Sequence, residues 1–252
     1  MSDSFSMNRL VQLTRNELER NYKAVLIVSA VLALLTLLGP AGRVYVLYTS
    51  VGFYRFFFLF ALFAWGTLAA SVAFRDMHGR LTNVPFLLLP ATALEKTLAR
   101  LLIGTVFLVV YLLLLVSVLS LVGETFELIG RGGNELFTPL DGVAWNVIPH
   151  FIIVQSVFFL GAAWFRKMHY VKTVLSVALL MTGLSLLAVL LVRIGLATWS
   201  GSGINFDGSD SFFVPAQWFG ELLKVAYFVG LPVFCWYVAW LRVKETQVSH
   251  GV

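Results

Sequence analysis

The chain has 252 residues, of which 59% are hydrophobic and only 12% are charged, and its mean hydropathy is +0.87. Soluble domains carry about 25% charged residues, so a soluble fold of this size could not hide so much apolar surface in its core. The net charge of +5 does not indicate a nucleic-acid-binding protein, because neither a basic run nor a soluble module accompanies it. The composition therefore predicts an all-α, polytopic membrane protein.

The first twenty-three residues precede the first long apolar stretch and differ from it in pattern. Mainly apolar residues recur there at spacings of three and four, and they are Met7, Leu10, Val11, Thr14, Leu18 and Tyr22. This spacing predicts that residues 1–23 form an amphipathic helix lying in the membrane surface. The alternative is a soluble tail helix that packs on nothing.

About six stretches are long and apolar enough to cross the bilayer, which takes roughly 20 residues. In chain order they lie near Tyr22–Leu38, Phe53–Phe74, Leu98–Val122, Val147–Phe165, Thr173–Thr198 and Leu222–Leu241. They lack the alternating polarity of membrane β-barrel strands, being rich in Leu, Phe and Ala. We expect a transmembrane domain of six helices over residues 24–241.

The distribution of basic residues predicts the orientation of these helices. Segments 1–23, 75–100, 166–172 and 242–252 hold 13 of the 18 Lys and Arg residues. Because cytoplasmic loops carry the excess of Lys and Arg, these segments are expected in the cytoplasm, with both termini there and 242–252 as a tail. Tryptophans fall near both ends of the predicted spans, as an aromatic belt requires.

The inner segment 75–97 has more structure than a simple connection needs. Gly79 can end the preceding helix, and Pro85 and Pro90 keep the next stretch extended or turning. Thr92 and Glu95 then have the spacing of a capping box, which predicts a helix that starts there and runs into the third span. A well-capped connection with no other role is the alternative.

These features together resemble an ABC-2 type permease, the membrane subunit of an ABC exporter. The motif that carries the resemblance is Leu88-Leu89-Pro90-Ala91-Thr92-Ala93-Leu94-Glu95-Lys96. The resemblance implies that segment 75–97 carries a coupling helix that docks onto a separate ATPase subunit, with 166–172 as a shorter second contact. The residues thereby assigned to the ATPase-facing surface are Arg75, Gly79, Arg80, Pro90, Thr92, Glu95, Lys96, Arg166 and Lys167.

The same resemblance has further implications for location and partners. It implies the bacterial cytoplasmic membrane, surrounding membrane lipids, and a dimer with a second copy or a related permease. ATP and Mg²⁺ would be bound by the ATPase subunit alone, so this chain would need no cofactor of its own. Family members often place a re-entrant helix before the last span, but Trp199–Glu221 is only weakly apolar here. Glu95 would both cap its helix and meet the partner, so Glu95→Lys is expected to abolish coupling while leaving insertion nearly normal.

Enzymatic chemistry has little support in the sequence. No GxxxxGK[ST] phosphate loop and no HExxH metal motif occurs. The four histidines, His78, His150, His169 and His250, are scattered over different loops and termini. We therefore predict neither catalytic nor metal-binding residues, and we expect Cys235 to serve in packing.

The interiors of the spans contain only mildly polar groups, such as Gln155 and Ser156. Ion-coupled transporters place ionisable residues deep in the bilayer, so an external energy source fits this chain better. The leading hypothesis is a transport subunit driven by a separate ATPase. The alternative is a non-transporting assembly or anchoring protein, or an intramembrane enzyme.

Small residues share one face of the second predicted span, namely Gly66, Ala69, Ala70 and Ala73. Such a face lets helices approach closely in lipid, either at a subunit boundary or against a helix of the same chain. We favour the second interpretation. Pro232, preceded by Gly230, is expected to kink the last span, because proline removes a backbone donor.

Overall fold

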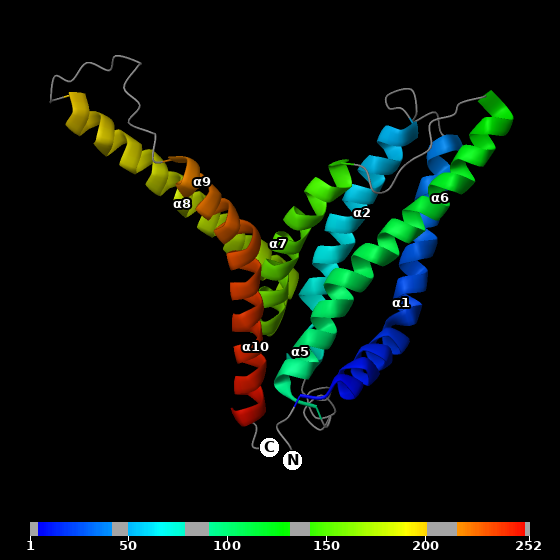
Figure 1. The fold of residues 1–252 in the computed structure, drawn as a ribbon, viewed down its shortest axis with the longest axis horizontal. Coiled ribbons are helices and arrows are strands. Elements are labelled where there is room, and N and C mark those ends of the chain that lie inside the picture. Colours follow the sequence, from blue (N-terminus) through cyan, green and yellow to red (C-terminus); the bar gives the residue numbers. More distant parts are fainter. Residues whose placement is uncertain (1–4, 42–49, 79–90, 132–141, 201–215, 250–252) are drawn as a thin grey trace.

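The computed structural model describes residues 5–41, 50–78, 91–131, 142–200 and 216–249, and these parts are helical without any strand. The helices, in order, are α1 (Met7–Ala41), α2 (Ser50–Val72), α3 (Arg75–His78), α5 (Ala93–Leu102), α6 (Leu108–Arg131), α7 (Gly142–Trp164), α8 (His169–Ser200), α9 (Ala216–Val225) and α10 (Leu231–Ser249) (Figure 1). Two π-helical turns, η2 (Ile103–Phe107) and η3 (Ala226–Gly230), join α5 to α6 and α9 to α10. The predicted all-α class is confirmed for these residues.

Five described helical stretches are long and apolar enough to cross a membrane. They are Gly52–His78, Ala93–Gly123, Trp145–Trp164, His169–Leu191 and Gly220–Thr246. Each overlaps one of the last five spans predicted from the sequence. The first predicted span, Tyr22–Leu38, lies within α1 and is not among the five, so a sixth span remains a prediction.

Helix α1 joins the predicted amphipathic segment and the predicted first span in one continuous helix of 35 residues. Its N-terminal part is inclined to the rest (Figure 1). Leu10 and Thr14 are buried, whereas Met7, Val11 and Tyr22 are more than half exposed. The apolar face is therefore only partly covered by the chain itself, and its contact with a membrane surface stays a prediction.

The buried side chains form two clusters, stacked along the helices. One joins α2, α6 and α7 around Phe58, Leu112 and Phe151. The other joins the end of α2 with α3, α7 and α10 around Phe74 and Phe159, whose rings meet edge to face with centroids 4.8 Å apart. The second cluster supports the charged end described below.

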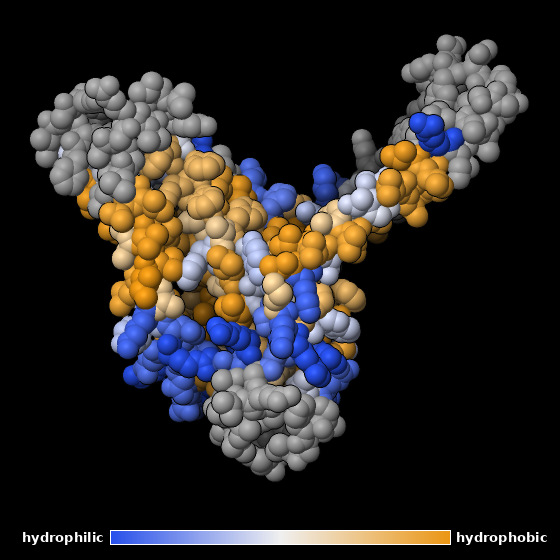
Figure 2. All heavy atoms as spheres, turned by 180° about the vertical axis from the view of Figure 1, so that it is seen from behind, coloured by the Kyte–Doolittle hydropathy of each residue, from blue (hydrophilic) through white to orange (hydrophobic). Residues whose placement is uncertain are grey.

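Helix α8 extends away from these clusters, as Figure 1 shows. None of its most apolar window is buried within the chain, and leucines on all its sides are exposed. A helix that is apolar all round needs lipid or another protein around it, because water would not solvate it. Figure 2 shows the same division over the molecule, with apolar surface above a band of hydrophilic side chains.

The small-residue face of α2 packs within the same chain, as we favoured. A Cβ atom added to Gly66 would collide with the ring of Phe151 on α7, and Ala70 is 1% exposed. The last span is interrupted by η3 just before Pro232. Pro232 cannot donate to the carbonyl four residues earlier, which accounts for an irregular turn at this position.

Candidate functional site

Four segments that the charge count assigns to one side of the membrane are in direct contact. Arg20 of α1 reaches Asp76 of α3 at 2.7 Å, and Asp76 also meets Arg100 of α5 at 3.4 Å. The rings of His78 and His169 stack with their centroids 5.3 Å apart, linking α3 to the start of α8. The end of α10 joins them through Thr246, whose hydroxyl donates to the sulfur of Met77 at 3.4 Å. We call this region the charged end.

The start of α5 is the best-defined part of the charged end. The Thr92 hydroxyl accepts from the Glu95 backbone N–H at 3.2 Å, and the Glu95 carboxylate accepts from the Thr92 N–H at 2.8 Å. The predicted capping box is therefore confirmed. Two orphan donors of the first turn are satisfied in this way.

Glu95 also holds the N-terminal segment. Its carboxylate accepts from the backbone N–H of Ser6 at 2.7 Å and pairs with the Arg9 guanidinium at 3.2 Å. The Glu95 side chain is 0% exposed, whereas that of Arg9 is 32% exposed. A buried carboxylate is stable only when its oxygens are paired and hydrogen-bonded. We call this arrangement of Ser6, Arg9, Thr92 and Glu95 the α1–α5 latch.

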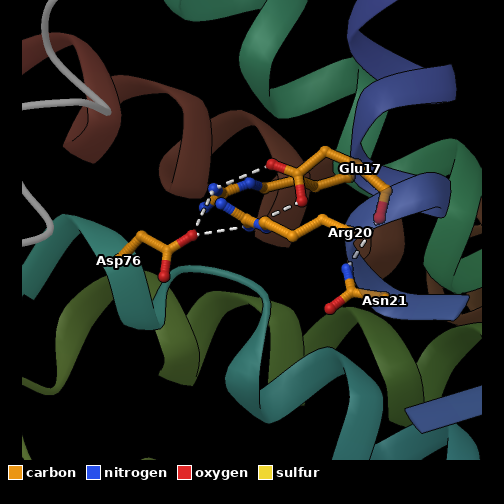
Figure 3. Close-up of polar contacts among 5 residues, drawn as sticks. Glu17, Arg20, Asn21 and Asp76 are labelled. Atoms are coloured by element: carbon orange, nitrogen blue, oxygen red, sulfur yellow. Dashed lines mark hydrogen bonds and ion pairs between the residues drawn. The ribbon is translucent and has the colours of Figure 1, made fainter. Parts of the chain in front are cut away.

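A second ion-pair network joins α1, α3 and α5, and Figure 3 shows three of its members, Glu17, Arg20 and Asp76, pointing toward one another. Arg20 contacts both Glu17 and Asp76 at 2.7 Å. Arg100 contacts the same two carboxylates at 3.2 and 3.4 Å. Each carboxylate thus has two cationic partners, so the network of Glu17, Arg20, Asp76 and Arg100 is redundant.

Arg100 is the buried centre of this network, with its side chain 7% exposed. Its guanidinium also lies over the Phe74 ring, 5.4 Å from the centroid, where a cation is attracted to the aromatic face. A buried charge left without partners would be strongly unfavourable. The network therefore fixes the positions of α1, α3 and α5 relative to one another.

The residues assigned to the ATPase-facing surface fall into three groups. Gly79, Arg80 and Pro90 lie outside the described residues. Thr92 is the N-cap of α5, and Glu95 and Lys96 lie in its first turn and are buried. Arg75, Arg166 and Lys167 are exposed, at the start of α3 and in the turn between α7 and α8.

This placement revises the expectation for Glu95. Its carboxylate is used within the chain, so the capping role has direct geometric support, whereas contact with a partner remains a prediction. Glu95→Lys would bury a second cation beside Arg9, and a change with little effect on folding is no longer expected.

Six members of the latch and the network were absent from the site residues predicted from the sequence. The missing residues are Ser6, Arg9, Glu17, Arg20, Asp76 and Arg100. The charged residues of segment 1–23 indicate that this helix has ion-pair partners elsewhere in the chain. The sequence does not identify these partners, because many residues could pair with Glu17 or Arg9 until the distant segments are placed in space.

The histidines are less scattered than the sequence suggested, because His78 and His169 are stacked. His78 Nε2 lies 3.0 Å from the carbonyl oxygen of Ala162. The surrounding charges are cationic, since Arg166 and Arg242 lie within electrostatic range of His78. Such surroundings disfavour a metal ion, and the described residues contain no group of three possible metal ligands.

One buried side-chain amide lies inside the helix bundle rather than at its charged end. Gln155 of α7 is 0% exposed, and both atoms of its amide lack a hydrogen-bond partner among the described residues. Its Nε2 faces Gly104 in η2, where an added Cβ would lie 3.3 Å away. π-Helical turns often occur at functional sites, so the position of Gln155 beside η2 makes it a candidate functional residue within the described spans.

Comparison with models of protein families, with curated proteins and with solved structures finds no match for this chain.

Proposed function

We propose that this chain is the membrane subunit of an ABC exporter and that a separate ATP-binding subunit docks on its charged end. Two copies, or one copy and a related permease, form the path across the membrane. Both termini face the cytoplasm of a bacterial cell. Hydrolysis of ATP by the partner moves the subunit between inward-facing and outward-facing states.

The observation that supports this proposal is the way in which the N-terminus of α5 is capped and held to α1. A coupling element must transmit force from a partner to the spans, so it has to be rigid and continuous with one of them. Helix α5 begins at a complete capping box, is held to α1 by Glu95, and continues through η2 into α6. Motion imposed at Thr92 would therefore reach both the third span and α1.

Exposed groups near this element supply a surface for the partner. Leu94 in the first turn of α5 is 39% exposed, and Arg166 and Lys167 are exposed in the turn between α7 and α8. We expect acidic side chains on the ATPase opposite these two cations. Charge complementarity of this kind mainly sets the orientation and rate of docking.

Co-purification tests the proposal directly. The chain would be tagged and co-expressed with the phosphate-loop ATPase encoded by a neighbouring reading frame, and the purified complex assayed for ATP hydrolysis. We expect the ATPase to co-purify and the complex to hydrolyse ATP, while the tagged chain alone does not. Hydrolysis by the clean isolated chain would contradict the proposal, and failure of any ATPase to bind would favour an assembly or anchoring role.

A pair of charge variants locates the docking surface. The double variant Arg166→Glu, Lys167→Glu should reduce the amount of co-purified ATPase, because it reverses two charges in the docking turn. Lys23→Glu reverses an exposed charge on α1 at the same end and should leave co-purification unchanged. If both variants retained the ATPase equally, the turn between α7 and α8 would not be part of the interface.

A further inference from the structure

An open apolar groove of about 480 Å³ runs along the outer face of α2. Its walls are Phe56, Leu59, Phe60, Phe63, Ala64, Thr67, Phe158 and Tyr170, from α2, α7 and α8. Four of the α2 residues recur at spacings of four and three, which places them along one face of the helix. The volume falls in the range of ligand sites, roughly 300–1,000 Å³.

One end of the groove meets the charged end of the molecule. Tyr170 stacks on Phe158 with a centroid distance of 5.2 Å, and it directly follows His169 in α8. Arg75 and Lys172 both lie within electrostatic range of His169. Arg75 begins α3, eight residues after Thr67, which is the groove residue closest to the charged end along α2. The groove therefore opens onto a cluster of cations.

The charge of this cluster is not neutralised by the residues that the structure describes. Neither Arg75 nor Lys172 has an ion-pair partner among them, and the neighbouring carboxylate, Asp76, is engaged by Arg20 and Arg100. Of the undescribed residues that adjoin this end in sequence, 1–4, 79–90 and 250–252, only Asp3 is acidic. An anionic group is the missing complement.

We propose that the groove and its basic mouth form a binding site for one anionic phospholipid. An acyl chain lies against the phenylalanines of α2, and the phosphate lies between Arg75 and Lys172. Basic pockets between membrane helices on the cytoplasmic side bind anionic headgroups in this manner. Tyr170 stands at the boundary, where an amphipathic ring suits the level of the headgroups.

A phospholipid fits this site better than a soluble phosphate or an acidic protein surface. A soluble anion would use the cations but leave the groove empty, with Phe56 and Phe60 more than half exposed. An acidic protein surface would have to cover Phe56, Phe60 and Tyr170 as well as the charges. Only a lipid brings a long apolar chain and a phosphate in one molecule. The site is independent of the proposed transport role.

Lipid titration of the purified chain in detergent, followed by native mass spectrometry, tests the proposal. Phosphatidylglycerol and phosphatidylcholine with the same acyl chains would be compared, since they differ in net charge. We expect one saturable phosphatidylglycerol site that binds several-fold more tightly than phosphatidylcholine. Arg75→Gln and Lys172→Gln should each weaken phosphatidylglycerol binding about fivefold. The control Lys23→Gln removes an exposed charge from α1 and should have no effect.

The groove and the headgroup site can be tested separately. Ala64→Phe fills the groove and should weaken the binding of both lipids, because it occupies the space proposed for the acyl chain. Glycerol phosphate and inorganic phosphate should not displace the bound lipid. Equal affinity for the two lipids, or wild-type affinity in both charge variants, would overturn the proposal. Displacement by inorganic phosphate would show a site for soluble anions instead.

Discussion

The backbone N–H of Ser6 donates a hydrogen bond of 2.7 Å to the carboxylate of Glu95, although the two residues are 89 positions apart. The same carboxylate caps α5 and pairs with Arg9. A single buried side chain therefore fixes both the start of α1 and the start of α5. Changes at Glu95 should consequently affect stability and coupling together.

Removal of the Glu95 carboxylate should be costly. Glu95→Ala removes a cap and leaves the partly buried N–H donors of Thr92 and Ser6 without an acceptor, so we expect a loss of about 2–4 kcal/mol in the free energy of unfolding. Glu95→Gln keeps one acceptor and should cost less. The free energy of unfolding would be measured in detergent micelles by denaturant titration.

The matched control for the latch is the exposed pair Arg15–Glu19, whose side chains are 78% and 62% exposed. A double-mutant cycle on Arg15 and Glu19 should give a coupling energy below about 0.5 kcal/mol. The equivalent cycle on Arg9 and Glu95 should give about 0.5–3 kcal/mol. Equal coupling energies in the two cycles would show that the latch is a surface contact.

The redundant network should respond non-additively. Arg100→Gln leaves Glu17 and Asp76 with Arg20 as a partner, and Arg20→Gln leaves them with Arg100. Each single variant should therefore be tolerated better than a broken buried pair, which costs about 3–5 kcal/mol. The double variant should lose more stability than the sum of the losses in the two single variants, as measured by thermal unfolding. Simple additivity would show that the two arginines act independently.

Much of the fold could be predicted from the sequence, because membrane helices are encoded by long local patterns. The capping box depends on Thr92 and Glu95, which are three positions apart. The small-residue face that includes Gly66 lies along a single helix. The predicted amphipathic segment continues into the predicted first span as one helix, and the sequence has no proline or glycine between Met7 and Leu38.

The candidate site was harder to predict, because its contacts join distant segments. Arg100 could pair with any acid near the charged end, and only the packing of α1 and α3 against α5 selects Glu17 and Asp76. The stacking of His78 on His169 likewise depends on where α8 starts relative to α3. The π-helical turn at Ile103–Phe107 could not be predicted from the sequence, because a single glycine, Gly104, within an apolar stretch does not distinguish a π-helical turn from an α-helix.

Close packing between α2 and α7 predicts a specific effect at Gly66. Gly66→Ala would force the Phe151 ring to move, and overpacking of this kind costs about 1–3 kcal/mol. Gly183→Ala in α8 is the matched control, because no atom lies within 4 Å of its added Cβ. It should be neutral or slightly stabilising, since alanine favours helix. Thermal unfolding in detergent measures both variants, and equal midpoints would contradict the close contact between α2 and α7.

The orientation can be tested at the two ends of α7. In a Cys235→Ala background, Lys167→Cys lies in the turn after α7, and Asn146→Cys lies near its start. Both native side chains are exposed. An impermeant thiol reagent added to intact cells should label Asn146→Cys but label Lys167→Cys only after permeabilisation. The reverse pattern would invert the orientation predicted from the basic residues.

Gln155 provides a test of whether polarity inside the bundle serves stability or transport. Burying an amide without hydrogen-bond partners lowers the free energy of unfolding by about 1–3 kcal/mol. Gln155 therefore does not stabilise the fold better than an apolar residue would. Gln155→Met has a similar shape and no amide, and we expect it to unfold at the same or a higher denaturant concentration. In the proposed complex with an ATPase, transport should nevertheless be slower, because the amide facing η2 is lost. Ser156→Ala is the control, since the Ser156 hydroxyl donates to the Ile153 carbonyl of its own helix at 2.7 Å. If Gln155→Met destabilises the protein, then the amide has a partner, such as a bound water, and its role is structural.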